Sequence, residues 1–257
     1  PSDNATGVGL TANLVVTFTE QIARGTGTID IYEAGVGLHE SIDVAGASVT
    51  ISGAQATIDP SSTFDDSTAY YVQIASTCFR DLAGNAYAGI ADNTTWNFIT
   101  VDTTSPAVSA YSPADNATGV TLAANLVLTF TEPISKGSGT VDIYQSGGAL
   151  FESIDVTTAG VSVSGTQATI DPTGTFDDGT GYYVQVGAAC FEDPAGNTYT
   201  GIADATTWNF TTVDTTTPKA VGFSPTDGAV SVAVNTNLVI TFDEPVNPVA
   251  DTIHIRE

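Results

Sequence analysis

Methionine is absent from the 257 residues, and histidine, cysteine and tryptophan each occur only twice. Basic side chains are also scarce, because five Lys and Arg stand against 29 Asp and Glu, for a formal net charge of -24. Nucleic acids and anionic membranes are both held through Lys and Arg, so this balance argues against either as a partner. No apolar run approaches the roughly 20 residues of a membrane span, so we expect no membrane insertion in this segment.

The sequence also lacks a secretory leader, and it opens on the loop-like residues Pro1-Ser2-Asp3-Asn4, which favours a mature protein or a fragment. Its few Lys, abundant Thr, Val, Gly and Asp, and two cysteines indicate an extracellular location, secreted or at the cell surface. Apolar residues make up 42% and charged residues 13%, a composition typical of globular chains. At about 100–150 residues per domain, the length predicts about two domains.

What the sequence does contain is an internal repeat. A shift of 112 residues places Pro1 on Pro113, Cys78 on Cys190 and Trp96 on Trp208 without a gap, and roughly two-thirds of the paired positions are identical. A third copy begins near residue 218 and then weakens. We therefore expect repeat 1 at residues 1–105 without its first strand, a complete repeat 2 at 106–217, and a partial repeat 3 at 218–257. Units of this size carry their own cores, so the sequence predicts a window on a longer array of domains.

Within repeat 2 the pattern is that of β-strands. Short runs rich in β-branched and aromatic residues, bounded by Gly, Pro, Asn, Asp or Ser, occupy residues 125–131, 140–144, 152–156, 161–163, 181–186 and 207–211. No stretch has a helical period, so the spacing predicts an all-β sandwich. In the Tyr182-Tyr183 pair one ring should enter the core and the other face out. The predicted core includes Leu126, Leu128, Phe130, Tyr144, Ile170, Trp208 and Phe210.

Residues 101–106 and 213–218, which join successive repeats, are β-branched, lack glycine and end in proline. Such segments are short and stiff, unlike Gly/Ser tethers. We therefore expect the sandwiches to follow one another end to end in a rod.

The motifs of each unit resemble a known family. Repeat 2 reads Ser-Pro-x-Asp-Asn-Ala-Thr-Gly-Val, then Asn-Leu-Val-Leu-Thr-Phe-Thr-Glu-Pro-Ile, Asp-x-Ala-Gly-Asn-x-Tyr and Thr-Thr-Trp-Asn-Phe-Thr-Thr. This pattern is similar to the bacterial Ig-like repeats typified by S-layer proteins, the SbsA type, over nearly the whole chain. The resemblance implies tandem Ig-like sandwiches in large secreted or surface-anchored bacterial proteins, where they act as spacers, stalks and adhesive or assembly modules. It implies no shared catalytic residue.

Acidic and amide side chains gather at the ends of the units and make calcium the one candidate cofactor. Calcium takes six to eight oxygen ligands from Asp, Asn and backbone carbonyls. The Asp-x-x-Gly-Asn turns, the joints and the turns that open each unit supply Asp81, Asn85, Asp102, Asp115, Asn116, Asp193, Asn197, Asp214 and Asp227. Convergence of Asp102 with Asp115 and Asn116 would stiffen a joint. The alternative is that Asp-x-x-Gly-Asn is only a tight turn closed by its own Asp.

Catalysis finds no support in the sequence. The tight acidic pairs, Asp65-Asp66 and Asp177-Asp178, precede a strand and fit solvated turns. His39 is matched by Phe151 in repeat 2, so no imidazole is available there for a Ser-His-Asp or Cys-His mechanism. We therefore expect no enzyme.

Each of the first two units carries one cysteine, Cys78 and Cys190. A disulfide needs Cα atoms within about 7 Å, so two cysteines a domain length apart do not pair with each other. A packed free thiol and an inter-chain disulfide both fit a lone cysteine in a secreted chain.

Taken together, these features predict a non-enzymatic, extracellular structural segment of a larger surface protein: a stalk, spacer, filament or surface-layer unit. Its partners would be copies of itself or neighbouring repeats. The alternative is an adhesin module that contacts a surface glycan.

Overall fold

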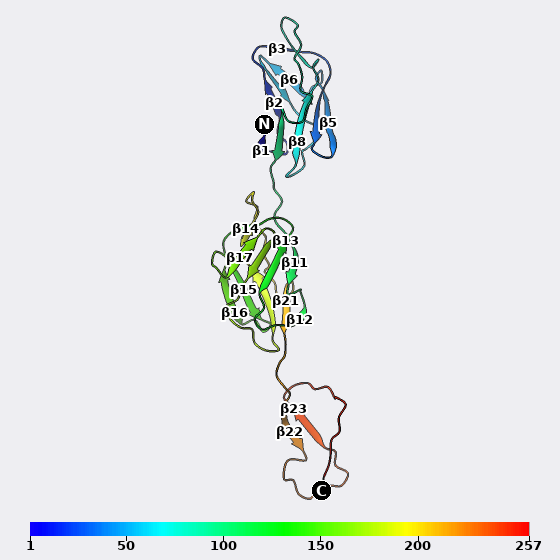
Figure 1. Ribbon diagram of the computed structural model, residues 1–257, viewed down its shortest axis with the longest axis vertical. Helices are drawn as coiled ribbons and strands as arrows, with labels where there is room; N and C mark the ends of the chain where they lie inside the picture. Colours follow the sequence, from blue (N-terminus) through cyan, green and yellow to red (C-terminus); the bar gives the residue numbers. More distant parts are fainter. Residues whose placement is uncertain (257) are drawn as a thin grey trace.

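In the computed structural model, which describes residues 1–256, three β-structured units follow one another along a long axis (Figure 1). Two sandwiches are joined by an extended segment, and a second extended segment leads to a smaller unit at the C-terminal end. Residues 1–256 contain strands, turns and loops and no helix, so none of their elements is a helix able to cross a membrane. The all-β architecture with sandwiches end to end is the one that the sequence predicts.

Repeat 2 is built from two facing sheets. The larger has the order β12-β21-β19-β15-β16, and the smaller has the order β11-β13-β18-β17. A short pair, β14-β20, closes one end. The strands are β11 (Val108–Ser112), β12 (Ala117–Val120), β13 (Leu126–Phe130), β14 (Ser135–Lys136), β15 (Thr140–Gln145), β16 (Leu150–Asp155), β17 (Val161–Ser164), β18 (Gln167–Ile170), β19 (Gly181–Val186), β20 (Phe191–Glu192) and β21 (Asn209–Thr212).

Repeat 1 repeats this plan with the orders β1-β10-β8-β4-β5, β2-β7-β6 and β3-β9. Its strands are β1 (Ala5–Val8), β2 (Leu14–Thr17), β3 (Ile22–Arg24), β4 (Thr28–Glu33), β5 (Gly37–Asp43), β6 (Val49–Ser52), β7 (Gln55–Ile58), β8 (Ala69–Ile74), β9 (Phe79–Asp81) and β10 (Asn97–Thr100). The smaller sheet has three strands where repeat 2 has four, because no described residue of repeat 1 corresponds to β11.

Strand alternation decides which side chains form the core. Along β19, Tyr182, Val184 and Val186 are buried between the sheets, whereas Tyr183 lies on the outer face, as the sequence predicts for the tyrosine pair. Six of the seven expected core residues are buried: Leu126, Leu128, Phe130, Ile170, Trp208 and Phe210.

Tyr144 is the exception, and placing it in the core was wrong. Val141 and Ile143 are the buried residues of β15, so the period of two turns Tyr144 outward. There its ring stacks on Tyr183 of the neighbouring strand, with centroids 5.1 Å apart and planes 10° from parallel.

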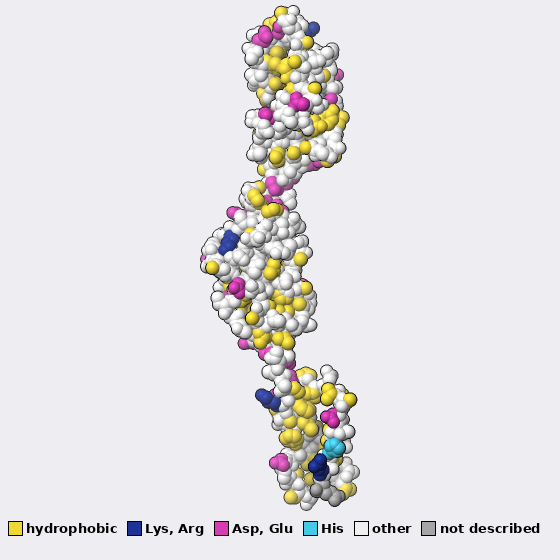
Figure 2. All heavy atoms as spheres, in the orientation of Figure 1, with side chains coloured by type: hydrophobic (Ala, Val, Ile, Leu, Met, Phe, Trp, Pro, Cys, Tyr) yellow, Lys and Arg dark blue, Asp and Glu magenta, His cyan; other side chains and the backbone are white. Residues whose placement is uncertain are grey.

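The third unit contains the antiparallel pair β22 (Ala220–Ser224) and β23 (Val239–Phe242), in a register equivalent to that of β11 and β13. Phe223, Val239 and Ile240 are largely exposed here. Figure 2 shows apolar side chains on the surface of this unit and acidic side chains near both joints.

Candidate metal centre at the joint between repeats

The segment between β10 and β11 is held by repeat 1 through one carboxylate. Asp66 lies in the turn before β8 and accepts hydrogen bonds from the backbone N–H of Thr103 (2.8 Å) and from its hydroxyl (2.7 Å). Its second oxygen accepts from the hydroxyl of Thr104 at 2.8 Å. The Thr103 hydroxyl is the first cause of a lowered Asp66 pKa, because these donors favour the ionised form. The tight acidic pair therefore includes a residue that binds the linker.

Repeat 2 holds the same segment from the other side. The side-chain amide of Asn197 donates to the backbone carbonyl of Asp102 at 3.1 Å. Further along, the backbone N–H of Thr131 donates to the carbonyl of Ala107 at 2.8 Å, and the N–H of Ala107 donates to the Thr131 hydroxyl at 3.2 Å. The joint therefore has contacts from both neighbours along most of its length.

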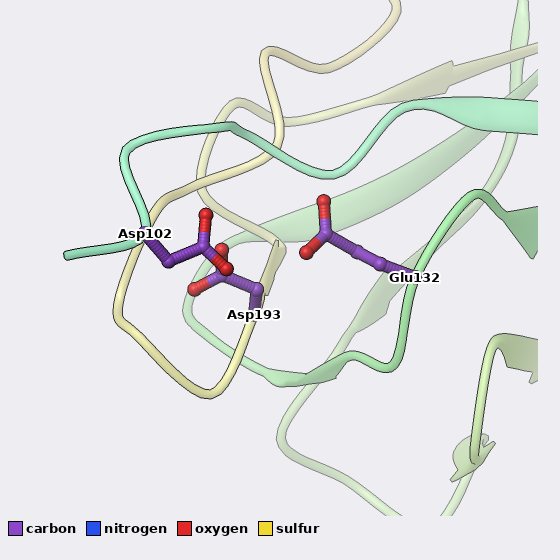
Figure 3. Close-up of side chains that lie close together, drawn as sticks. All are labelled: Asp102, Glu132 and Asp193. Carbon is purple, nitrogen blue, oxygen red and sulfur yellow. The ribbon is translucent and has the colours of Figure 1, made fainter. Parts of the chain in front are cut away.

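Three carboxylates meet where these contacts converge. Asp102 comes from the linker, Glu132 follows β13, and Asp193 follows β20. One oxygen from each lies within 4.8 Å of the other two, and the close-up shows the three groups pointing toward one another (Figure 3). Asp193 is buried, and the other two are half-buried.

The electrostatics of the cluster are unbalanced. Burial raises the pKa of Glu132, and the negative charges of Asp193, Asp102 and Asp66 raise it further. For Asp193, burial raises the pKa, but hydrogen bonds from the side chain and backbone N–H of Asn197 outweigh it, so the net shift is downward. Asp193 therefore stays ionised, and its negative charge disfavours the ionised form of the neighbouring Glu132.

This arrangement suits a hard cation with oxygen ligands. Carboxylates from three separate segments, close together and partly removed from water, are the donors that calcium and magnesium prefer. A divalent cation would offset the mutual repulsion that raises the Glu132 pKa. Calcium takes six to eight oxygen ligands, so water and backbone carbonyls would have to complete the shell around these three carboxylates.

Of the residues predicted as calcium ligands, the structure brings together Asp102 and Asp193, with Asn197 bonded to both. Glu132 was missed. The feature of the sequence that could have identified Glu132 as a ligand is its place in the Thr-Phe-Thr-Glu-Pro motif, directly after a core strand.

Convergence of Asp102 with the turn that opens repeat 2 is not what the structure shows. The Asp115 carboxylate accepts from the N–H (3.0 Å) and side-chain amide (2.9 Å) of Asn209, at the start of β21, and from the side chain of Asn116. Asp115 and Asn116 therefore tie the turn to the larger sheet, because the turn lies one strand beyond the joint.

The remaining predicted ligands lie in partial versions of the site. In repeat 1, the Asp81 carboxylate accepts from the backbone (2.8 Å) and side chain (2.6 Å) of Asn85, which closes the Asp-x-x-Gly-Asn turn on itself. At the second joint, Asp214 interacts with Glu244, the counterpart of Glu132, and the Asp214 charge raises the Glu244 pKa in addition to desolvation. Asp227 is exposed.

Both cysteines are buried free thiols. Cys78 and Cys190 have no exposed surface, and their Sγ–H groups donate to the carbonyls of Thr28 (3.2 Å) and Thr140 (3.3 Å). Burial raises the pKa of both thiols, that of Cys190 to about 11. An inter-chain disulfide needs a thiol at the surface, so this alternative is wrong for the described fold.

The two sheets, the end-to-end order and the joints define a tandem Ig-like sandwich protein. A family model described as "Bacterial Ig-like domain" matches residues 1–100, 102–212 and 214–255. The chain therefore belongs to the bacterial Ig-like domain family, with one match for each repeat.

Three solved structures match this chain at low identity and low TM-score. One is a three-Ig structure of titin in an E-to-A mutated variant, at 10% identity and a TM-score of 0.34, covering 84% of this chain and 64% of that one. A second contains the FN1–FN3 domains of chicken CNTN1, at 13% identity and a TM-score of 0.35, and the match covers 96% of this chain and 76% of that one. A third is a biofilm-associated protein (BSP domain), at 12% identity and a TM-score of 0.21, and the match covers 84% of this chain and 30% of that one.

The chain spans less than two thirds of the titin and biofilm-associated structures. No curated protein matches it.

Proposed function

We propose that this chain is a non-enzymatic structural segment of an extracellular bacterial surface protein, acting as a stalk or spacer of the kind used in surface layers. Membership of the bacterial Ig-like family supports a structural or adhesive repeat in general. The observation that carries the stalk in particular is the joint, where residues of the linker are hydrogen-bonded to the repeat on each side. A chain of sandwiches held in this way keeps a set distance between its ends.

The physical basis of the stalk is simple. Each sandwich resists unfolding through its own core, and the joints transmit direction from one core to the next. The formal net charge of -24 makes neighbouring rods repel one another at moderate salt. Side-by-side aggregation is thereby disfavoured, while the end-to-end order is maintained by covalent linkage.

Imaging of the native surface protein by electron microscopy tests this function. We expect thin rods whose length grows in steps of one sandwich per repeat. Compact particles with the repeats folded back on one another would contradict a stalk, and a lattice or filament would favour an assembly unit instead.

A calcium-stiffened joint is part of the proposal, supported by the Asp102, Glu132 and Asp193 cluster. A cation that binds only the folded joint would add RT ln(1 + [L]/Kd), about 2.7 kcal/mol at a hundredfold excess over Kd. We expect melting of repeat 2 to rise in millimolar calcium relative to excess chelator. The Glu132→Gln variant should lose this gain, whereas Glu20→Gln, the same position in repeat 1, should keep it. Superimposable curves for the unaltered chain would remove calcium from the proposal.

An adhesin module is the second candidate, supported by the outer face of the larger sheet. Tyr32 stacks on Tyr71 in repeat 1 at 5.0 Å between centroids, and Tyr144 stacks on Tyr183 in repeat 2. An exposed leucine, Leu38 or Leu150, lies across from the first tyrosine of each pair. A glycan array separates the two functions: a stalk should bind nothing, whereas an adhesin should bind a sugar and lose it in Tyr71→Ala and Tyr183→Ala variants.

A further inference from the structure

The turn before β8 in repeat 1 and the turn before β19 in repeat 2 each present an aspartate that accepts hydrogen bonds from the following linker. In repeat 1 it presents Asp66 to Thr103 and Thr104. In repeat 2 the equivalent Asp178 accepts from the backbone N–H of Thr215 at 2.9 Å, from its hydroxyl at 2.7 Å, and from the N–H of Thr216 at 3.2 Å. The same contact therefore occurs at the equivalent position of both repeats, which makes it a feature of the repeated unit.

These contacts lie where the chain leaves the sandwich. The last strand of the larger sheet ends at Thr100 in repeat 1 and at Thr212 in repeat 2. The next residue of each linker, Val101 or Val213, still donates its N–H to the neighbouring strand, and the residues after it are no longer paired with the strands of their own sandwich. An extended segment without such a partner is free to swing about its first residue. The aspartate supplies acceptors to donors three and four residues beyond the strand end and so restricts that movement.

The neighbouring residue, Asp65, anchors the turn to the sandwich through its backbone. In the Asp65-Asp66 pair, the backbone of Asp65 is bonded to the sandwich: its N–H donates to the Tyr70 hydroxyl, and its carbonyl accepts from the Thr100 hydroxyl. The Asp66 side chain is thus presented from a turn anchored to the core, and a rigidly held acceptor orients what it binds.

We propose that Asp66 and Asp178 are positioning residues by which each repeat sets the direction of the linker, and through it of the next repeat. The inference rests on the proposed stalk function and deepens it, because a stalk whose joints swing would not keep its ends apart. At the first joint the side-chain amide of Asn197, in the following repeat, also donates to the Asp102 carbonyl, so the linker is bonded to both repeats.

The test uses the full 257-residue chain with spin labels at equivalent exposed positions, Thr50→Cys in repeat 1 and Ser162→Cys in repeat 2. Cys78 and Cys190 are buried, and the chain without the added cysteines serves to show that they take up no label. Pulsed electron paramagnetic resonance then reports the distribution of distances between the repeats. We expect one narrow peak for the chain with Asp66, and a broad distribution reaching shorter distances for Asp66→Ala.

Asp65→Asn is the matched control. It removes the same charge one residue away and leaves the linker contacts in place, so its distribution should equal that of the parent. A second route avoids a charge change altogether: the double variant Thr103→Val, Thr104→Val removes both hydroxyl donors on the linker and should broaden the distribution in the same direction. If Asp66→Ala fails to fold, the double variant decides.

For the second joint, small-angle scattering of Asp178→Ala should show a smaller maximum dimension than the parent chain. Unchanged distance distributions in both Asp66→Ala and the double variant, with both folded, would overturn the proposal. That result would leave the stalk itself standing if imaging still shows rods. Rods absent from the parent protein would instead count against the proposed function, whatever the distance distributions of the Asp66 variants.

Discussion

Repeat 1 and repeat 2 share one fold and roughly two-thirds of their residues, yet the end that faces the preceding unit is packed differently in the two. In repeat 2 this end is covered by the linker and by β11, which pairs with β13. Repeat 1, as described, has no strand on the equivalent edge of β2.

Burial follows this difference residue by residue. Phe130 and Tyr199 are buried in repeat 2, whereas their counterparts Phe18 and Tyr87 are only half-buried. The same holds for the acidic position of the Asp-x-x-Gly-Asn turn, Asp193, whose counterpart Asp81 is half-buried.

The comparison teaches that the segment connecting two repeats is also part of the second repeat's core. Tyr111 of β11 lies against Trp208, with ring centroids 5.2 Å apart, and adds apolar cover that a separate linker would not supply. Joining and folding are therefore coupled in such an array. Four measurements would sharpen or break this comparison.

Truncation of the central tryptophan should have the largest effect. Trp208 is fully buried, and its indole N–H donates to the Pro113 carbonyl at 2.8 Å. Trp208→Ala should cost about 3–5 kcal/mol of unfolding free energy, because it leaves a large cavity and an unpaired carbonyl. Calorimetry of the full chain should show the repeat 2 transition fall while that of repeat 1 stays. A loss below about 1 kcal/mol would mean that this side chain is not in the core.

Removing the β11 ring that covers Trp208 should come next. Tyr111→Ala takes away the half-buried cover of Trp208, and we expect repeat 2 to lose about 2 kcal/mol. Repeat 1 should keep its melting temperature, since Tyr111 packs against the core of repeat 2. Equal losses in both transitions would contradict the assignment of β11 to the core of repeat 2.

The third measurement exchanges one half-buried ring that packs against the core between the repeats. His39 packs on Phe64 and Tyr70, and its Nε2 is buried without a hydrogen-bond partner, the one such atom in residues 1–256. Phe151 fills the same place in repeat 2. His39→Phe should stabilise repeat 1 by about 1 kcal/mol, and Phe151→His should destabilise repeat 2 similarly. Thermal melts of both variants check this, and a destabilising His39→Phe would show that the nitrogen finds a partner in water.

The smallest effect is expected from the acidic joint. The Glu132 pKa is raised above its ordinary value of 4.5 in the folded protein, so at pH 7 its ionised form counts against folding. This cost disappears as the pH falls through the raised pKa toward 4.5. Without calcium, Glu132→Gln should therefore stabilise repeat 2 at pH 7, and the gain should vanish below about pH 4.5. Glu20→Gln is the control, because Glu20 is exposed. A gain that is independent of pH would contradict the electrostatic origin.

Much of this fold could be read from local pattern. The period of two places Tyr182 inside and Tyr183 outside, because successive side chains of a strand point to opposite faces. The same rule explains the error at Tyr144, where an aromatic residue was assigned to the core by its type although Val141 and Ile143 define the buried face of its strand.

The state of the cysteines was open in the sequence for a different reason. A strand end can place a thiol in the core or at the surface, and the local residues fit both. The structure decides for the core, where Cys190 donates to Thr140, 50 residues away in the chain.

By itself, then, the sequence determined the repeat, the strands and the sandwich, because periodicity and self-similarity are properties of neighbouring residues and of spacing. Only the tertiary structure decided which acidic residues meet. Asp102, Glu132 and Asp193 belong to three segments that become neighbours when repeat 2 folds onto its linker. Asp115, whose place in the turn that opens the unit had suggested a meeting with Asp102, faces Asn209 instead. Contacts between distant segments depend on how the sheets pack and where the linker enters, and no local pattern contains that information.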